Sequence, residues 1–395
     1  MKKEIIEEYA YSKVPFYQEL LQENDCLNYP IINKELLLEK RDKFFSTNCI
    51  GDLYAGKLES VMTSGSTGEC LEIFWKKEDN IRSLLPLWIK RKRYYDILPS
   101  DKYVYFFTTC IEKGNVLEYK EVKNGLGINK IGLTQERILD IYKRIQEYSP
   151  KWIIIQPSVL AIFLKTIKQY KLNNLPSLKY IEVTGELLMD SVRKEIIDFF
   201  QCPVASQYGC YEVNSIAYEC PCHNMHIMEE NVDVEIVDGN NICVTSLHNS
   251  VMPFIRYKVG DRGEIRNQIK CKCGDKSPIL VLQKARDNDL IYYKNGTAEH
   301  SDIFYHIIEK INIYLQQVIL QFQIIQEKYD DFWIYLTIDD LQDREEVQEL
   351  FLSMAKKYNK KWNCYIIFVD SLYPCEKTGK LAWFVSKVKG DKNED

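Results

Sequence analysis

The chain has 395 residues and a hydrophobic content of 46%, which together favour two globular domains over one small core. Its formal net charge of −5 excludes a global basic field that would attract nucleic acid or an anionic membrane. No apolar run reaches membrane-spanning length, and residues 1–8 are acidic where a signal peptide has its apolar core. We therefore expect a cytoplasmic protein whose 13 cysteines are mostly reduced, with no nucleic-acid or membrane partner.

The segment up to residue 206 predicts helices and then alternating strands and helices. Charged helices are expected within residues 1–45, and an amphipathic helix over 80–95. Strands are predicted at 103–108, 152–156, 178–183 and 203–206, with helices at 157–170 and 189–200. This alternation indicates parallel βαβ units, in which ligands bind beyond the carboxyl ends of the strands. The Gly185-Glu186 turn and the loop after Ser206 are therefore candidate site positions.

The remaining chain predicts a β-rich subdomain and then a small separate domain. Residues 232–246 alternate in hydrophobicity around a Gly-Asn-Asn turn, which indicates a hairpin. Strands at 290–293, 316–325, 332–338 and 364–369, with helices at 301–313 and 345–358, follow the β-α-β-β-α-β order of ferredoxin-like domains. We therefore predict an α/β fold with a large N-terminal domain (residues 1–285) of mixed and parallel sheets. A small ferredoxin-like α+β domain (residues 286–395) completes it.

A run of hydroxyl residues and glycines is the first candidate for chemistry. Its glycines let the backbone approach a ligand closely, and its amides and hydroxyls can face an anion such as a nucleotide phosphate. No Gly-Lys-Ser/Thr ends the run, so it is not a Walker loop. A solvated Ser/Gly turn is the alternative. The residues are Thr63, Ser64, Gly65, Ser66, Thr67 and Gly68.

Three further segments carry residues suited to binding a nucleotide. Tyr208 follows a predicted strand, and the carboxylate of Glu212 is a ligand type that Mg²⁺ prefers. Asp261 follows a strand and a glycine and can accept hydrogen bonds from a ribose diol. Lys380, after another glycine, can neutralise a phosphoryl group or a carboxylate. The alternatives are a surface turn, a Gly-Asp hairpin turn and an ordinary exposed lysine.

The order and spacing of these segments resemble the acyl-adenylate-forming enzymes. Within that superfamily the chain is most similar to the phenylacetate–CoA ligase branch, which includes coenzyme F390 synthetase-like and capsule-biosynthesis relatives. The N-terminal segments 14–17 (Val-Pro-Phe-Tyr) and 30–34 share this resemblance. The motifs that carry it are the loop at 63–68, Gly185-Glu186, Tyr208-Gly209-x-x-Glu212, Tyr257-x-x-Gly-Asp261 and Thr378-Gly379-Lys380.

The resemblance implies a reaction in two halves. A carboxylate attacks the α-phosphate of ATP, giving acyl-AMP and pyrophosphate, and a thiol then displaces AMP to give a thioester. Lys380 would bridge the carboxylate and the α-phosphate, and Glu212 would hold Mg²⁺. Together these cations would offset the repulsion between two anions. The C-terminal domain would rotate between the halves about a hinge near Asn288.

The resemblance also implies where the nucleotide binds. The loop at 63–68 would embrace the phosphates of ATP. The Gly185-Glu186 turn and the Tyr208-Gly209 segment would flank the adenine. Asp261, together with Arg286, would hold the ribose hydroxyls.

Two positions depart from the family's pattern. Members often carry a lysine near the end of the phosphate loop, where this chain has Glu69-Cys70. Phosphate neutralisation is therefore expected to rest on Mg²⁺ and Lys380. The usual Gly-Arg-x-Asp at the hinge is Ala-Arg-Asp-Asn over residues 285–288, and asparagine can still serve as a hinge residue.

Cysteines and histidines gather in two short segments, Cys220-Pro-Cys222-His223-Asn-Met-His226 and Cys271-Lys-Cys273. Paired ligands from two loops are the usual source of a tetrahedral zinc site. A coincidental group of core thiols is the alternative. We predict structural zinc on Cys220, His226, Cys271 and Cys273, with Cys222 in reserve and His223 as a further candidate. Four protein ligands leave no open position for catalysis.

The acid and its acceptor stay open. The branch implies an aromatic acid, for which Tyr103, Phe107 and Tyr211 are pocket candidates, although core aromatics are the alternative reading. Coenzyme A and the phosphopantetheine of a free-standing carrier protein would both present a thiol. An adenylating ligase that acylates an amine or hydroxyl, and a zinc-stabilised nucleotide-binding protein without catalysis, are the other hypotheses.

Overall fold

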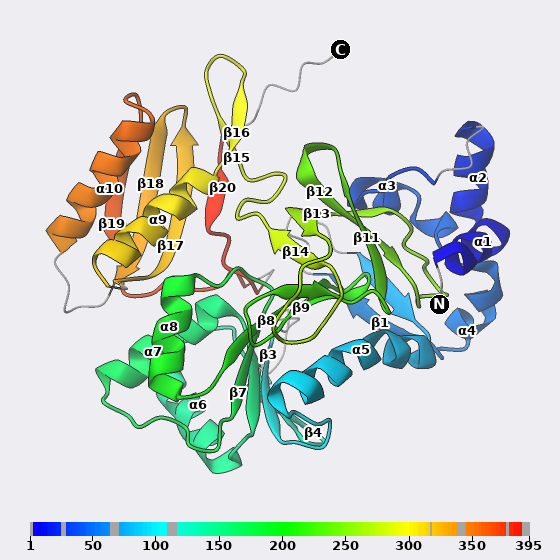
Figure 1. Ribbon diagram of the computed structural model, residues 1–395, viewed down its shortest axis with the longest axis horizontal. Coiled ribbons are helices and arrows are strands. Elements are labelled where there is room, and N and C mark those ends of the chain that lie inside the picture. The colour runs from blue at the N-terminus through cyan, green and yellow to red at the C-terminus, as the bar shows by residue number, and fades with distance from the viewer. Residues whose placement is uncertain are drawn as a thin grey trace. The chain divides into compact units, whose positions relative to one another are not determined.

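The computed structural model describes residues 3–24, 29–63, 71–108, 117–316, 318–338, 344–376 and 379–388 (Figure 1). The chain forms two compact units, each made of two segments that are distant in sequence. The first unit comprises residues 1–99 and 205–283, and the second comprises residues 100–204 and 284–395. Within the described residues, no helix is both long and apolar enough to cross a membrane.

The first unit combines N-terminal helices with antiparallel strands. A short hairpin pairs β1 with β2, and seven further strands follow the spatial order β11-β12-β13-β14-β10-β9-β8. The predicted hairpin at 232–246 is confirmed as β11 and β12. The elements are α1 (Lys3–Lys13), α2 (Pro15–Asn24), α3 (Lys34–Glu39), η1 (Arg41–Lys43), η2 (Thr47–Cys49), α4 (Ile50–Tyr54), β1 (Glu59–Met62), β2 (Glu72–Trp75), α5 (Lys77–Tyr95), β8 (Val204–Cys210), β9 (Asn214–Glu219), β10 (Met225–Ile227), β11 (Val232–Val237), η3 (Asp238–Asn240), β12 (Asn241–Ser246), β13 (Tyr257–Arg266) and β14 (Ile279–Leu282).

Aromatic side chains hold the core of the first unit together. Phe16, Tyr17 and Phe44 are fully or almost fully buried and meet mostly edge to face, with ring centroids 5.1–5.7 Å apart. Phe254 joins them from the segment before β13. The Tyr17 hydroxyl donates to the Pro253 carbonyl at 2.6 Å, so its polar end is satisfied inside the core. These contacts fasten the N-terminal helices to the strands of this unit.

The second unit begins with the predicted βαβ pattern. The strands β7, β6, β3 and β5 are parallel neighbours in that order, and β4 adds an antiparallel edge. Pro157 occupies the first turn of α7, where its missing N–H costs nothing, and Thr134 caps α6 through the amide of Arg137. The elements are β3 (Tyr103–Phe107), β4 (Tyr119–Val122), β5 (Gly125–Asn129), α6 (Gln135–Tyr148), β6 (Trp152–Ile155), α7 (Pro157–Gln169), β7 (Tyr180–Thr184) and α8 (Asp190–Phe200).

The C-terminal part of the second unit is a small α+β fold. Its four-stranded sheet has the order β19-β18-β17-β20, and α9 and α10 cover one face of it (Figure 1). Phe304 and Trp362 stack within its core at 4.9 Å between ring centroids. The elements are β15 (Leu290–Tyr292), β16 (Ala298–His300), α9 (Asp302–Tyr314), β17 (Ile319–Lys328), β18 (Asp331–Ile338), α10 (Arg344–Tyr358), β19 (Asn363–Phe368) and β20 (Phe384–Ser386).

One detail of the predicted ferredoxin-like order differs in the structure. The strand expected at 290–293 exists as β15, but it pairs with β16 in a separate hairpin. The sheet instead gains β20, which runs parallel to β17. That strand has only three residues, too few for hydrophobic alternation to reveal it. The predicted α/β class, with mixed and parallel sheets and a small C-terminal domain, is confirmed.

The domain division predicted after residue 285 stays a prediction. One boundary between the compact units falls between Gln283 and Lys284. The backbone amides of Lys284 and Ala285 both donate to Asp302 Oδ1, at 3.0 and 2.8 Å, where α9 begins. A continuous hydrophobic core joins residues 104–204 to the C-terminal α+β fold within the second unit.

Candidate functional site

Tyr208 in β8 and Asp261 in β13 meet in the first unit. The Tyr208 hydroxyl donates to Asp261 Oδ2 at 2.9 Å. Next to it, Gly209 leaves no room for a side chain, because an added Cβ would lie 2.1 Å from the Asn214 carbonyl oxygen. The register of β8 and β9 shifts between Tyr208 and Gly209, so this glycine permits the close backbone approach at a bulge. The structure thus joins two of the predicted nucleotide-binding residues.

Glu212 lies in the turn that joins β8 to β9. The residue is 7% exposed, and its carboxylate accepts a hydrogen bond at 2.9 Å from the hydroxyl of Tyr257 in β13. Burial and the nearby Glu212 carboxylate raise the pKa of the Cys210 thiol well above its usual range. Tyr211, the pocket candidate before Glu212, is 51% exposed, and its role stays a prediction. The fixed carboxylate is the ligand type that Mg²⁺ takes.

The predicted phosphate loop is described only at its base. Thr63 and Leu71 form a closed pair: the Thr63 amide donates to the Leu71 carbonyl, and the Leu71 amide donates to Thr63 Oγ1, each at 2.9 Å. The antiparallel strands β1 and β2 extend this pair away from the loop. Ser64, Gly65, Ser66, Thr67 and Gly68 lie outside the described residues, and so do Glu69 and Cys70.

Lys380 lies in a tight turn of the second unit. The Gly379 amide donates to the Cys375 carbonyl at 2.7 Å, and the Cys375 amide donates to the Lys380 carbonyl at 3.0 Å. Gly379 has φ +63°, a conformation that favours glycine. A Cβ added at Gly185 would lie 3.7 Å from Lys380 Cε, so the lysine side chain passes beside the Gly185 turn. Two predicted site segments therefore meet in this unit.

Glu186 uses its carboxylate within the protein. Oε2 accepts from the Ser158 amide at 2.9 Å, in the first turn of α7. The free amides and the dipole of the helix stabilise a negative charge at this end. Oε1 accepts from the Ser158 hydroxyl at 2.9 Å and from the Leu381 amide at 2.8 Å. Within the turn predicted to flank adenine, the Glu186 side chain therefore connects α7 to the residue after Lys380.

Lys130 is a site residue that the sequence analysis did not single out. It directly follows β5, it is 6% exposed, and its Nζ donates to the Gly379 carbonyl. Burial lowers the pKa of Lys130 to about 8, an effect that Glu186 opposes and Lys380 reinforces. Its position at the carboxyl end of a parallel strand was the available signal.

The other predicted site residues described in the second unit are Tyr103, Phe107 and Arg286. Tyr103 stacks on Trp152 at 5.1 Å between ring centroids, and Tyr103, Tyr105 and Phe107 form a row along β3. An added Cβ at Gly125 would lie 2.7 Å from the Tyr103 ring, so this ring packs over bare backbone. The Arg286 amide donates to Asp289 Oδ2 at 3.0 Å within its own turn.

The four predicted metal ligands come together in the first unit. Cys220 follows β9, His226 is in β10, and Cys271 and Cys273 lie between β13 and β14. Their ligand atoms all lie within 4.8 Å of one another. The sulfurs of Cys220 and Cys271 are 3.7 Å apart, and Cys273 Sγ is 3.3 Å from His226 Nε2. Tetrahedral zinc places two sulfur ligands about 3.8 Å apart and a sulfur and a nitrogen about 3.5 Å apart.

Neighbouring groups orient this cluster. His226 is fully buried, and its Nδ1 lies 3.0 Å from the Ser277 carbonyl, a contact that directs Nε2 to the thiols. Burial alone would raise the pKa of the Cys271 thiol, but hydrogen bonds from the Cys273 backbone, Asn224 and His226 lower it to about 6. A lowered thiol pKa favours the thiolate that binds metals. The donor set of three thiols and one imidazole therefore fits structural zinc.

The two other candidate ligands do not belong to this group of four, although the Cys222 thiol interacts with the thiols of Cys220 and Cys271. Cys222 and His223 are both exposed. His223 Nδ1 lies 3.0 Å from Glu219 Oε1 instead. Among the described residues, the group suited to a metal is the one predicted: Cys220, His226, Cys271 and Cys273.

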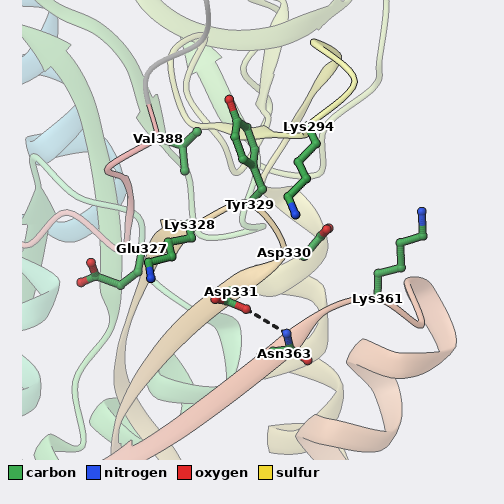
Figure 2. Close-up of a pocket in the computed structure, with 9 residues that line it drawn as sticks. All are labelled: Lys294, Glu327, Lys328, Tyr329, Asp330, Asp331, Lys361, Asn363 and Val388. Atoms are coloured by element: carbon green, nitrogen blue, oxygen red, sulfur yellow. Dashed lines mark hydrogen bonds between the residues drawn. The ribbon is translucent and has the colours of Figure 1, made fainter.

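A hollow of about 520 Å³ lies at the turn between β17 and β18 (Figure 2). Lysine and acidic side chains line it in equal number, and Asn363 donates to Asp331 across its floor at 2.8 Å. With equal numbers of positive and negative side chains, the hollow favours neither an anionic nor a cationic ligand. Of the described residues predicted for the site, none lines it. The lining residues are Lys294, Glu327, Lys328, Tyr329, Asp330, Asp331, Lys361, Asn363 and Val388.

Comparison with known proteins agrees with this architecture. Residues 292–387 match the family model described as the CapK C-terminal domain. The chain is 22% identical over 414 residues to Protein CapK of Staphylococcus aureus, covering 96% of this chain and 87% of that protein.

Solved structures of CoA ligases share the fold. A 2-hydroxyisobutyryl-CoA ligase in the postadenylation state, in complex with R3-HIB-AMP, has a TM-score of 0.72 at 13% identity, with coverage of 96% of this chain and 86% of that one. The anthranilate CoA ligase AuaEII in complex with anthranoyl-AMP has a TM-score of 0.55 at 12% identity, with coverage of 82% and 65%. The chain therefore has the fold of AMP-forming CoA ligases.

Proposed function

We propose that the protein activates a carboxylic acid with ATP, forming acyl-AMP and releasing pyrophosphate, and then transfers the acyl group to a thiol. The observation that carries this proposal is the turn at Lys380, which holds a lysine beside Gly185 in a fold shared with AMP-forming CoA ligases. A lysine in that position is suited to bridging a carboxylate and an α-phosphate. The acid is expected to be aromatic.

The residues of the site take the following roles in this proposal. Lys380 neutralises the two anions as they meet, and Glu212 holds Mg²⁺, which supplies charge neutralisation at the phosphates. Tyr208 and Asp261 bind the nucleoside, with Arg286 as the second ribose contact. The loop that begins at Thr63 binds the phosphates. The backbone of the Gly185-Glu186 turn and Gly209 form the adenine surroundings.

The Cys220–His226–Cys271–Cys273 cluster binds structural zinc in this proposal. Its four ligands fill a tetrahedral site, so its role is to hold the loops around β10 rather than to activate a substrate. The acceptor thiol belongs to coenzyme A or to the phosphopantetheine of a separate carrier protein.

Exchange of labelled pyrophosphate into ATP tests the first half-reaction. The purified protein with Mg²⁺ is assayed against aryl, arylacetic and short hydroxy acids, and at least one acid is expected to support exchange. Lys380→Ala should lower that exchange by on the order of 10²–10³-fold, because the transition-state charge loses its cation. Thioester formation from supplied acyl-AMP should persist in this variant. No exchange with any acid would refute the proposal.

The acceptor is identified in the same preparation. Coenzyme A is added with the active acid, and the acyl-CoA product is measured by mass spectrometry. Exchange without acyl-CoA formation would direct the search to a carrier protein, an amine or a hydroxyl. Protein that binds ATP but supports no exchange would fit the non-catalytic alternative.

A further inference from the structure

The backbone is fastened on both sides of Lys380. The Gly379 carbonyl accepts a hydrogen bond from Lys130 Nζ, and the Leu381 amide donates to Glu186 Oε1 at 2.8 Å. Both partners come from the 100–204 segment of the second unit. Each bond joins a charged side chain to a backbone group, which makes it stronger than a neutral pair.

The fit around Gly379 is tight. An added Cβ would lie 2.1 Å from Thr108 Oγ1 and 2.8 Å from Lys130 Cε. Gly379 is buried although it belongs to a turn. The backbone of Gly379 therefore packs closely against Thr108, which follows β3, and Lys130, which follows β5.

The two fastening side chains are themselves rigidly held. Glu186 accepts from both the amide and the hydroxyl of Ser158 at the start of α7. The Ser158 carbonyl in turn accepts from Gln321 in β17, at 3.1 Å. The Lys130 amide donates to the Phe107 carbonyl at 3.0 Å, which extends the β3–β5 pairing to this residue. Lys130 and Glu186 thus act from fixed positions.

We infer that Lys130 and Glu186 are positioning residues that clamp the Lys380 turn in place for acyl-AMP formation, an inference that rests on the proposed function. The clamp consists of the Lys130–Gly379 and Glu186–Leu381 hydrogen bonds. Both bonds are made to the backbone, one on each side of Lys380. A long side chain misplaced by about 1 Å can lose on the order of 10²-fold in rate.

The clamp includes a side chain whose burial costs free energy, because Lys130 is a buried cation. A neutral donor would suffice for one hydrogen bond to a carbonyl, yet the chain buries an ammonium close to the second ammonium of Lys380. Glu186 partly offsets this repulsion, and burial and Lys380 together hold the pKa of Lys130 to about 8. The charges of Glu186 and Lys380 both act on Lys130, so the three side chains interact electrostatically.

Two isosteric variants test the clamp. Lys130→Met removes the donor, and Glu186→Gln leaves too few acceptor positions for the three donors of Ser158 and Leu381. Each should lower kcat for acid-dependent pyrophosphate exchange about 10- to 100-fold, with the KM for ATP changed less than about threefold. Thioester formation from supplied acyl-AMP should fall less than about threefold. Lys120→Met, on the exposed face of β4, is the matched control and should match the wild type.

Hydrogen exchange gives a readout independent of activity. Peptides spanning residues 373–383 should exchange faster in both variants than in the wild type and in Lys120→Met. If Lys130→Met does not fold, Lys130→Gln replaces it, with the same expected changes to a smaller extent. Unchanged kcat, an equal fall of both half-reactions, or unchanged exchange of this peptide would overturn the clamp. If the wild type supports no pyrophosphate exchange, the proposed function fails, and the peptide exchange still decides whether the clamp exists.

Discussion

The proposed zinc cluster (Cys220, His226, Cys271 and Cys273) and the clamp inferred at Lys380 would hold their loops in different ways. Both join residues that are far apart in sequence. The cluster uses side chains on both sides, all of types that bind metals. The clamp uses side chains on one side and backbone groups on the other. Side-chain chemistry is visible in a sequence, whereas a backbone carbonyl or amide is present at almost every position.

The largest expected effect is loss of the metal cluster. Cys273→Ser removes a thiolate ligand and should lower the melting temperature by on the order of 10 °C, because structural zinc contributes its binding energy to folding. Thermal unfolding and metal analysis of the purified protein measure this. Cys222→Ser changes an exposed cysteine that borders the cluster without being one of the four proposed ligands, and it should retain both stability and metal. Wild-type protein purified without bound zinc would contradict the assignment.

A smaller effect is expected at the glycine inside the clamp. Gly379→Ala forces a Cβ against Thr108 and Lys130 at a positive φ, and should destabilise the protein by about 2–4 kcal/mol. Gly185→Ala is the matched control, since its φ is also positive but its added Cβ meets only ordinary contacts. It should cost about 1 kcal/mol. Urea unfolding compares the two, and equal losses would show that crowding at Gly379 is unimportant.

Lys130 predicts a pH dependence of stability. Its pKa is lowered to about 8 in the folded protein by burial, against 10.5 ordinarily. Between these values the unfolded chain binds the proton and the folded protein does not, so the free energy of unfolding rises with pH, by up to about 3 kcal/mol. Urea unfolding is measured for the wild type and Lys130→Met at pH 7.5, 9 and 10. The free energy of unfolding of the wild type should rise with pH relative to that of the variant. Parallel curves would argue against a buried charge.

The smallest effect is expected at a pair of side chains in the first unit. Tyr208→Phe removes the 2.9 Å hydrogen bond to Asp261 while keeping the ring. The loss of orientation should raise the KM for ATP by about three- to tenfold, equivalent to about 1 kcal/mol. Steady-state kinetics with the active acid measure it. A change in kcat alone would mean that Tyr208 acts in the chemical step.

These contrasts also explain which features the sequence predicts. The strands at 152–156 and 178–183 and the helix from Pro157 were predictable, because hydrophobic runs and a helix-starting proline are local signals. The grouping of Cys220, His226, Cys271 and Cys273 was predictable because few other roles gather these residue types. The roles of the nucleotide-binding residues stay predictions.

The rest of the site depends on contacts that no local pattern contains. Lys130 is one of many lysines, and only folding brings it to the Gly379 carbonyl. The Glu186 oxygens accept from Ser158 and Leu381, because the turn after β7 lies against the start of α7, and these partners could not be read from the Gly185-Glu186 motif. The short strand β20 is likewise defined by its partner β17 rather than by its own sequence.

The interleaving of the two compact units has a consequence for synthesis on the ribosome. The segment 100–204 shares its core with residues 284–395 and is separated from them by residues 205–283. At roughly 5–20 residues per second, the ribosome needs about 4–16 s to make that intervening stretch. During this interval the apolar surfaces of α7 and α8 stay uncovered, because the residues that pack on them have not yet been synthesised. Nascent chains paused near residue 283 are therefore expected to be those most dependent on chaperones.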